Sequence, residues 1–190
     1  MIFERSRYVS RAGCPRMLAC WRSRRGRYFA IELAKLGAYS ITGLDISRTF
    51  VDIARNNAAE AGLAVDFRQG DAAKMPFPNR SFDFLLCRAA FKNFSQPLRA
   101  LQEMCRVLDS GGRAVIIDLR RDTSPAAVSR AVDEMHLGVI NTILTKGAFR
   151  FMLLKRAYTK QQFQDFLKQT NFRSIDIREN FLGLELMLSR

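Results

Sequence analysis

The sequence predicts one α/β domain in which helices cover both faces of a largely parallel sheet. From Tyr28 onward, segments with helical spacing of apolar residues alternate with short apolar strands, and short polar breaks separate them. The chain has 190 residues and 48% hydrophobic content, which is enough for one substantial core and too little for two full domains. Two strand-like segments close the chain, and we expect them to pair antiparallel.

The first half of this pattern is defined by its breaks. Gly37 and Gly62 end two helices, Ser47 is the expected N-cap of the second, and a loop with two prolines at 75–81 precedes a strand. In chain order we expect a helix over 28–37, a strand over 39–45, a helix over 49–62, a strand over 64–71, a strand over 82–87, a helix from Pro97 to the Gly111-Gly112 pair, and a strand over 113–119.

The second half begins with a stretch of mixed polarity and helical spacing over 123–157, which we expect to be a variable helical region. A clear helix follows over 158–172, with Thr159 as its cap and Phe163, Phe166 and Leu167 on one face. Strands over 173–180 and 182–190 complete the expected sheet.

Composition limits the environment and the function class. No apolar stretch approaches the roughly 20 residues that cross a bilayer, so we expect a protein that is soluble or at most peripheral. The opening residues lack the apolar core of a secretory signal, which makes the cytoplasm the expected compartment. The four cysteines, at 14, 20, 87 and 105, show no metal-binding spacing, and we interpret them as reduced structural thiols.

The net charge of +13 is unevenly distributed. Residues 1–28 contain eight arginines and one glutamate, whereas residues 29–190 contain 23 basic and 17 acidic residues. The basic stretch has no recognisable RNA-binding or DNA-binding pattern and no run of stacking aromatic residues. We therefore disfavour nucleic acid as a partner.

Residues directly after the expected strands are the candidates for ligand binding, because an open α/β sheet binds ligands at the carboxyl ends of its strands. Asp45 can accept hydrogen bonds from both ribose hydroxyls of a nucleoside; the alternative is a helix-capping role. Asp71 can accept from an adenine amine, with Gly70 allowing close approach and Ala72 leaving room for the ring; the alternative is an ordinary turn. Arg88 can bind a carboxylate, or lie on the surface.

The segment after the 82–87 strand also includes Phe91. Its ring is a candidate contact for a cation or an aromatic substrate, and the alternative is a core position.

Together these segments resemble the class I S-adenosylmethionine-dependent methyltransferases, in the small-molecule branch that includes ubiquinone and menaquinone C-methyltransferases (the type 11 methyltransferase domain). The resemblance is carried by TGLDIS, QGDAAKMPFPNRSFDFLLC and LRALQEMCRVLDSGGRAVIID and covers residues 28–120. It implies a doubly wound, Rossmann-like, seven-stranded sheet, S-adenosyl-L-methionine as cofactor, a small-molecule acceptor and no metal. The cofactor-binding residues it implies are Gly26, Asp45, Ile46, Gly70, Asp71, Ala72, Cys87 and Arg88, with Phe91 on the acceptor.

The resemblance implies roles for individual segments. The acid that ends the strand, here Asp45, holds the ribose, and the GDA segment holds adenine. The E-x-x-RVL-x-x-GG run, here from Glu103 to Gly112, leads from a helix into the fifth strand.

The chain departs from the family just before residue 28, where an acid-x-G-x-G-x-G loop is expected. Counting back from Tyr28, Trp21 occupies the acidic position, and Ser23, Arg25 and Arg27 occupy the glycine positions. Bulky and cationic side chains beside a sulfonium predict weaker cofactor binding, by about 2–5 kcal/mol. We treat 1–27 as an irregular basic segment and 28–190 as the methyltransferase domain.

A shifted reading frame is one hypothesis for this departure. GGN glycine codons read one base out of step become NGG, which encodes arginine, tryptophan or glycine, and CWRSRRGR is rich in these residues. A basic arm with another role is the alternative.

Four functions compete. The first is methyl transfer to an O, N or C atom of a small molecule, helped by alignment of the reacting centres. The others are an inactive methyltransferase-like binding protein, an RNA methyltransferase and a nicotinamide-dependent oxidoreductase, whose GxGxxG motif is absent. No catalytic base is assigned, since His136 lies in the variable helical region. The apolar residues expected around the acceptor are Met135, Leu137, Ile140, Phe149 and Phe151.

Overall fold

A computed structural model describes residues 16–20, 26–35 and 39–190. Its strands are β1 (Arg16–Cys20), β2 (Ser40–Asp45), β3 (Asp66–Gln69), β4 (Phe82–Arg88), β5 (Leu108–Leu119), β6 (Ser174–Glu179) and β7 (Gly183–Ser189). Its helices are α1 (Gly26–Lys35), α2 (Arg48–Glu60), α3 (Pro97–Val107), α4 (Pro125–Asp133), α5 (Val139–Ala148), α6 (Leu154–Arg156) and α7 (Lys160–Leu167), with a 3-10 turn η1 (Phe91–Asn93) and a π-helical turn η2 (Phe149–Leu153).

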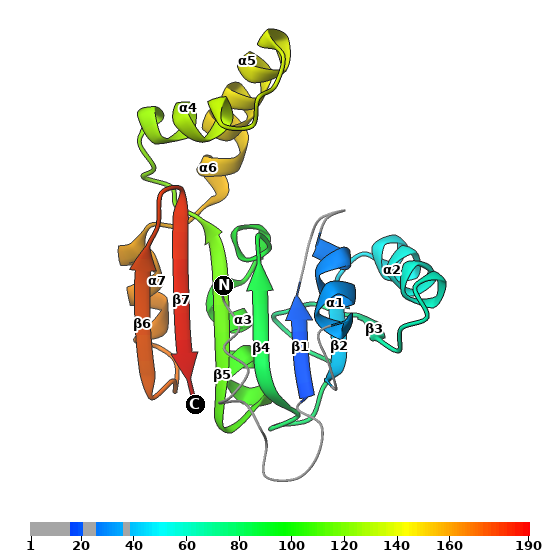
Figure 1. The fold of residues 1–190 in the computed structure, drawn as a ribbon. Coiled ribbons are helices and arrows are strands. Elements are labelled where there is room, and N and C mark those ends of the chain that lie inside the picture. The colour runs from blue at the N-terminus through cyan, green and yellow to red at the C-terminus, as the bar shows by residue number, and fades with distance from the viewer. Residues whose placement is uncertain (1–15, 21–25, 36–38) are drawn as a thin grey trace.

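The strands form one seven-stranded sheet in the order β3-β2-β1-β4-β5-β7-β6. The pairs from β3 to β5 are parallel, and β7 runs antiparallel to both β5 and β6 (Figure 1). The predicted doubly wound sheet with an antiparallel last pair is confirmed.

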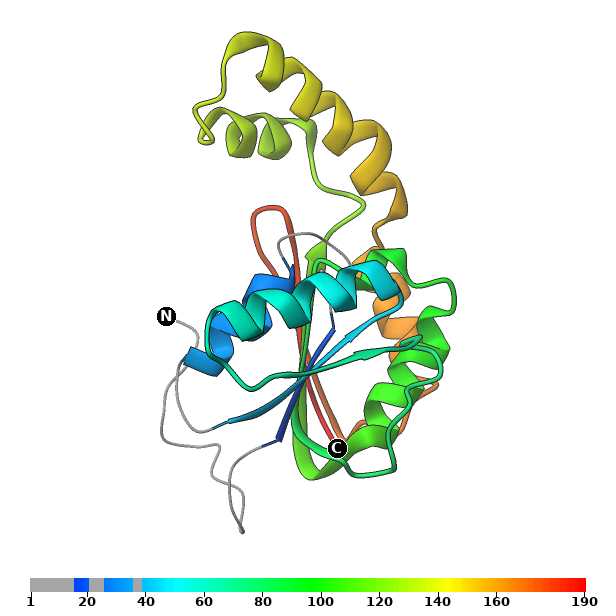
Figure 2. The same cartoon turned by 90° about the vertical axis from the view of Figure 1, so that its right-hand side faces the viewer.

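Helices cover both faces of the sheet, which Figure 2 shows edge-on. Alternate side chains of β1 point to opposite faces, so Met17 and Ala19 pack with α1 and α2, whereas Leu18 packs with the cluster that includes α3 and α7. The Thr159 cap of α7 is confirmed as a capping box: the Thr159 hydroxyl accepts from the Gln162 N–H, and Gln162 Oε1 accepts from the Thr159 N–H.

Two sequence predictions are corrected here. β1 lies within residues 1–27, for which we expected irregular structure, and it occupies the centre of the sheet with Met17, Leu18 and Ala19 buried. A strand of five residues between arginine-rich stretches shows too short an apolar run to be recognised. The second correction concerns α3, which ends at Val107 and not at the glycine pair, because β5 begins at Leu108.

The variable region 123–157 forms an arm of helices, α4 to α6, beyond the carboxyl ends of the parallel strands (Figures 1 and 2). A small separate cluster holds it together: Val128, Val132 and Leu154 are buried, and Phe149 packs against them. No described helix is long and apolar enough to cross a membrane.

Candidate functional site

The candidate site lies where β1, β2, β4 and β5 end, at one edge of the sheet (Figure 1). The structure places the predicted residues there: Asp45 is the last residue of β2, Gly70 and Asp71 follow β3, and Arg88 is the last residue of β4. The ends of β2 and β3 are directly joined, because the Gly70 N–H donates to the Asp45 carbonyl oxygen at 3.0 Å. The predicted ribose-binding and adenine-binding residues are therefore neighbours.

Asp45 is a buried carboxylate, with 2% of its surface exposed. Its Oδ1 accepts from the Ser47 backbone N–H at 2.8 Å. The side chain of Ser47 in turn caps α2 by accepting from the Phe50 N–H at 3.4 Å. Asp45 thus supports the strand-to-helix turn while Ser47 is the N-cap, and the turn fixes where the carboxylate points.

Ile46 has the opposite environment, because its side chain is 54% exposed directly beside the buried carboxylate. Its carbonyl oxygen accepts from Gln69 Nε2 at 3.2 Å, which ties it to the end of β3. An exposed apolar surface beside a buried acid suits a nucleoside, since the ring needs apolar contact and the sugar needs acceptors.

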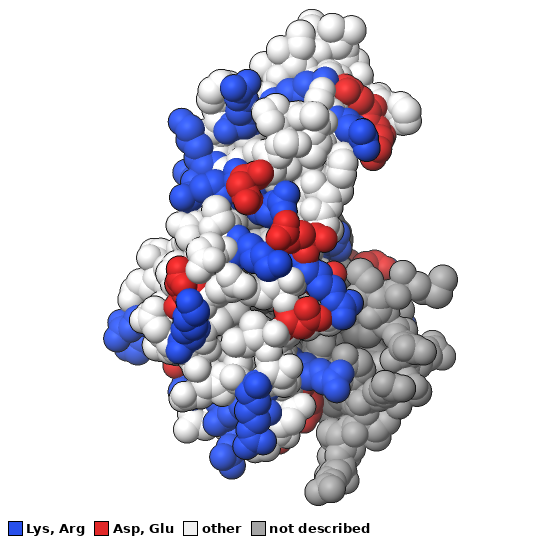
Figure 3. All heavy atoms as spheres, turned by 90° about the vertical axis from the view of Figure 1, so that its left-hand side faces the viewer, with Lys and Arg blue, Asp and Glu red and all other residues white. Residues whose placement is uncertain are grey.

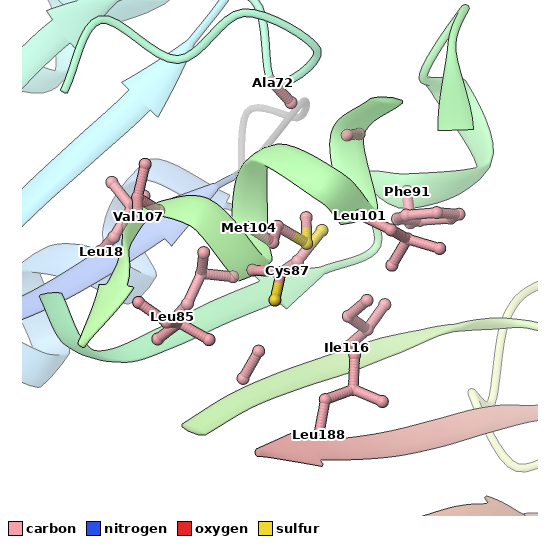
Figure 4. Packing of buried hydrophobic residues seen from close by; sticks show 14 of the residues in the cluster. Leu18, Ala72, Leu85, Cys87, Phe91, Leu101, Met104, Val107, Ile116 and Leu188 are labelled. Carbon is pink, nitrogen blue, oxygen red and sulfur yellow. The ribbon is translucent and has the colours of Figure 1, made fainter. Parts of the chain in front are cut away.

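The loop after β3 approaches the sheet closely at Gly70. A Cβ at this position would lie 2.8 Å from Leu44 Cδ1 and 2.9 Å from Pro76 Cδ, so a side chain does not fit without movement. Asp71 then forms a tight turn, with Oδ1 accepting from the Ala73 N–H at 2.9 Å and its carbonyl oxygen accepting from the Lys74 N–H at 2.9 Å. Ala72 is buried against the core (Figure 4).

Glu103 and Arg106 hold this loop from α3, a role that the sequence did not show. The Glu103 carboxylate accepts from the Met75 N–H at 2.8 Å, and Arg106 donates to the carbonyl oxygens of Met75 (3.1 Å) and Phe77 (2.8 Å). The two side chains also bind each other, with 2.7 Å between Arg106 Nε and Glu103 Oε1. The conspicuous E-x-x-R spacing is explained by this helix-to-loop clamp.

The interaction between Glu103 and Arg106 shifts the pKa of both side chains. The hydrogen bond from Arg106 lowers the pKa of Glu103 below its usual value, although partial burial opposes the shift. The bond to Glu103 raises the pKa of Arg106 in turn. Both groups are therefore charged at neutral pH.

At the end of β4, the predicted cofactor-binding residues Cys87 and Arg88 lie in different environments. Cys87 is fully buried, and its side chain packs among those of α3, including Met104 (Figure 4), so only its backbone lies at the edge of the sheet. Arg88 is exposed, and Ala89 follows in the left-handed region with a φ of 54°.

Phe91 is not a surface contact for a substrate. It is fully buried and packs against Phe94, Tyr158 and Phe163, with ring centroids 4.9–5.8 Å apart. The core alternative is therefore correct, and the aromatic cluster joins η1 to α7. Burial raises the pKa of the Tyr158 phenol in this cluster.

A buried ion pair lies beside this turn, between Lys92 and Asp118. The Lys92 ammonium is 2.8 Å from Asp118 Oδ1, and both side chains are nearly inaccessible. The carboxylate also accepts from the backbone N–H groups of Lys92 and Leu119, and Lys92 Nζ donates to the Ala89 carbonyl oxygen at 2.9 Å. The pair joins the ends of β4 and β5 and supports the strained residue Ala89.

The structure does not gather the apolar residues expected around the acceptor. Ile140 and Phe151 are exposed on the arm, as are Met135 and Leu137, while Phe149 packs against α4. His136 is exposed in the turn between α4 and α5, with a φ of 49°. Among the described residues, no group of three or more His, Cys, Asp or Glu is arranged to hold a metal ion.

The divergent loop follows β1 at the centre of this edge. Cys20 is in register with Leu44 on one side and Cys87 on the other, so the chain leaves β1 between the two predicted binding strands. Trp21, Ser23 and Arg25 lie outside the described residues, and Gly26 begins α1.

Comparison with known proteins agrees with this geometry. The methyltransferase domain family matches residues 25–116, which run from the start of α1 into β5. A demethylmenaquinone methyltransferase of Deinococcus radiodurans is 31% identical over 153 residues, covering 77% of this chain and 64% of the relative. A ubiquinone/menaquinone biosynthesis C-methyltransferase of Francisella philomiragia is 27% identical over 66% of this chain and 52% of the relative. The chain thus spans less than two thirds of either relative.

Solved structures support the fold. A SAM-dependent methyltransferase from Aquifex aeolicus superimposes with a TM-score of 0.68 at 18% identity, over 92% of this chain and 81% of that chain. A methyltransferase structure from Methanococcus maripaludis gives a TM-score of 0.70 at 20% identity, over 94% of this chain and 78% of that chain.

Proposed function

Because residues 25–116 match the methyltransferase domain family, we propose that the chain is a class I S-adenosylmethionine-dependent methyltransferase that transfers the cofactor's methyl group to a small-molecule acceptor. The observation that carries the proposal is the joined pair of strand ends, where the buried Asp45 carboxylate lies one backbone hydrogen bond from Gly70. Both the activity and the acceptor are part of this proposal, because the chain spans less than two thirds of its relatives' length.

The residues present fit the adenosyl half of the cofactor. Asp45 supplies a fixed acceptor for ribose hydroxyls, and Ile46 supplies exposed apolar surface beside it. When bound, S-adenosylmethionine supplies an electrophilic methyl group on a positively charged sulfur. The protein's part is to hold donor and acceptor in line and to exclude water, so no nucleophilic side chain is required.

The relatives suggest the acceptor class. Two of them are named for methyl transfer in menaquinone or ubiquinone biosynthesis, so we propose an apolar, ring-containing acceptor that enters between the end of β4 and the helical arm. Arg88, which ends β4, and Ala89 are both exposed, and they would lie on the proposed path of the acceptor.

One observation favours a second candidate, an inactive methyltransferase-like binding protein. The loop after β1 carries arginines where glycines are expected, and cationic groups there oppose a sulfonium. In that case the adenosyl half of the site persists while the methionine half is lost.

Calorimetric titration with S-adenosylmethionine and S-adenosylhomocysteine tests the proposal. Asp45→Asn keeps the shape of the side chain and removes its charge, and we expect it to weaken binding about tenfold to a hundredfold. Asp176→Ala, on β6, is the matched control and should bind as the native chain does. Asp45→Asn binding at native affinity would contradict the proposed site.

A second variant separates the two candidates. Combining Ser23→Gly, Arg25→Gly and Arg27→Gly should strengthen binding of S-adenosylmethionine more than that of the uncharged S-adenosylhomocysteine, because the repelled charge is on the sulfonium. No binding by the native chain together with recovery in this variant would favour the inactive protein. Transfer of radiolabelled methyl groups to a quinol acceptor by the native chain would favour the enzyme.

A further inference from the structure

The arm exposes an unusual amount of apolar surface. Eight of the eleven exposed large apolar side chains among the described residues lie between residues 135 and 152. Six of them are 62–77% exposed, and we call these six the outer stripe: Val139, Ile140, Ile143, Leu144, Phe151 and Met152. Neither α5 nor η2 contains a buried residue. Apolar surface gathered in this way marks an interaction site.

The stripe lies on the side of α5 that turns away from α4. Residues 139, 140, 143 and 144 share one side of a helix by its periodicity, whereas Phe149, at the start of η2, packs against the buried cluster that includes Val128 and Val132 of α4. Figures 1 and 2 place α4 between α5 and the sheet, so the stripe faces outward at the end of the molecule.

The charged residues next to the outer stripe indicate which kind of partner it binds. Residues 135–158 contain Lys146, Arg150, Lys155 and Arg156 and no Asp or Glu. Asp133 and Glu134 directly precede this range, and Asp133 pairs with Lys146, so Arg150, Lys155 and Arg156 are the basic residues that the stripe presents. Figure 3 shows uncharged atoms at the tip of the arm, with basic side chains and a group of acidic side chains below them. The guanidinium of Arg150 lies 5.7 Å from the Phe151 ring centroid, so cation and apolar ring are presented together. A basic, amphipathic helical surface is typical of segments that lie in an anionic membrane interface.

A second copy of the chain fits this surface less well. A symmetric dimer through the stripe would bring two sets of basic side chains together with no acidic residue from 135–158 to pair with them. An anionic bilayer both buries the apolar residues and neutralises the flanking charges.

We propose that the outer stripe and its basic neighbours dock the protein on the surface of an anionic phospholipid bilayer. No described helix is long and apolar enough to span, so α5 lies in the interface plane with Ile143 and Leu144 in the acyl boundary. The arm projects from the edge that carries Asp45 and Arg88, so docking brings the candidate site to the membrane surface, where apolar acceptors are concentrated. Docking requires neither the cofactor nor catalytic activity.

Vesicle sedimentation with the full 190-residue chain tests the proposal. We expect binding to vesicles of equal parts phosphatidylcholine and phosphatidylglycerol, and much weaker binding to phosphatidylcholine alone. The double variant Ile143→Glu with Leu144→Glu should lower the partition coefficient about tenfold or more, as should Lys155→Gln with Arg156→Gln. Ile175→Glu, an exposed apolar position on β6, is the matched control and should bind as the native chain does.

Three results would overturn the proposal. The first is no binding to anionic vesicles by the native chain. The second is native binding by the Ile143→Glu, Leu144→Glu variant, which would mean adsorption by charge alone. The third is a concentration-dependent dimer in sedimentation velocity that this variant abolishes, which would assign the stripe to a second copy. Ile143→Ser with Leu144→Ser, checked by circular dichroism, keeps the test decisive if the glutamates disturb folding.

Discussion

Glu103 makes the stability of the loop after β3 depend on pH. The hydrogen bond from Arg106 lowers the pKa of Glu103 in the folded chain, so the folded state favours the charged carboxylate. The resulting stabilisation is fully present above the unfolded pKa, near 4.5, and is lost as pH falls through the lowered folded value. Replacing Glu103 by Gln removes this contribution and leaves Arg106 with weaker partners.

We expect Glu103→Gln to lower the free energy of unfolding by about 1–2 kcal/mol near neutral pH. The difference from the native chain should shrink in acid, as pH falls below 4.5 and through the lowered pKa of the native carboxylate. Urea titrations at neutral pH and in acid measure this. Asp165→Asn removes an exposed carboxylate paired with Lys168 and should leave the midpoint nearly unchanged. A pH-independent difference for Glu103→Gln would contradict the charged clamp.

The positions of residues at the ends of strands could be predicted from the sequence. Contacts between residues that are far apart in the sequence could not. Asp45, Gly70 and Asp71 were placed correctly because a strand end fixes their edge of the sheet. Lys92 and Asp118 are separated by 26 positions, and nothing in either local pattern indicates that they pair. The two alternatives for Phe91 could not be separated from the sequence, because an apolar residue after a strand has the same pattern whether it lines a pocket or fills the core.

At the scale of elements, the contact between β5 and β7 depends on one glycine. Gly183 begins β7 opposite Leu119, and a Cβ at this position would overlap the Asp118 carbonyl oxygen. Asp118 is also half of the buried ion pair, so displacement of its backbone would disturb the end of β5. The antiparallel strand pair can close over the ion pair only with a residue that has no side chain here.

Gly183→Ala should therefore destabilise the chain by about 1–3 kcal/mol through overpacking. Gly147→Ala is the matched control, because nothing lies within 4 Å of a Cβ there and the residue is inside α5. That control should be neutral or stabilising by about 0.5–1 kcal/mol. Thermal unfolding of the two variants side by side measures the contrast, and equal midpoints would show that β7 adjusts to the added methyl group.

Element boundaries differ from prediction where the deciding contacts are distant. The glycine pair was expected to end α3, yet the helix ends at Val107 and the pair falls inside β5. Gly112 is required there first by its own strand, since a Cβ would lie 2.9 Å from the Asp109 carbonyl oxygen, and the Asp83 carbonyl oxygen of β4 would be 3.1 Å away. β1 was missed for a related reason, because the partners that bury its short apolar run, β2 and β4, come later in the sequence.

At the scale of the whole molecule, the sheet and the arm are stabilised very differently. Two large clusters pack the helices on the two faces of the sheet, whereas a separate small cluster of Val128, Val132 and Leu154 holds the arm. The seven-stranded sheet with its antiparallel last pair was predicted correctly, because alternating strands and helices admit few topologies. The exposure of the arm could not be predicted in the same way, because its exposed apolar residues have the same spacing in the sequence as residues on the buried face of a helix.

This difference predicts uneven hydrogen exchange. Amides of α5 and η2, which bury no side chain, should exchange faster than those of β4 and β5 by orders of magnitude, because local opening there exposes little apolar surface. Mass spectrometry of peptides from each element measures the rates. Anionic vesicles should slow exchange in α5 and η2 and leave β4 and β5 unchanged, because docking buries the outer stripe alone. Equal slowing throughout the sheet would instead indicate global stabilisation, and slowing around Asp45 alone would place the lipid in the cofactor site.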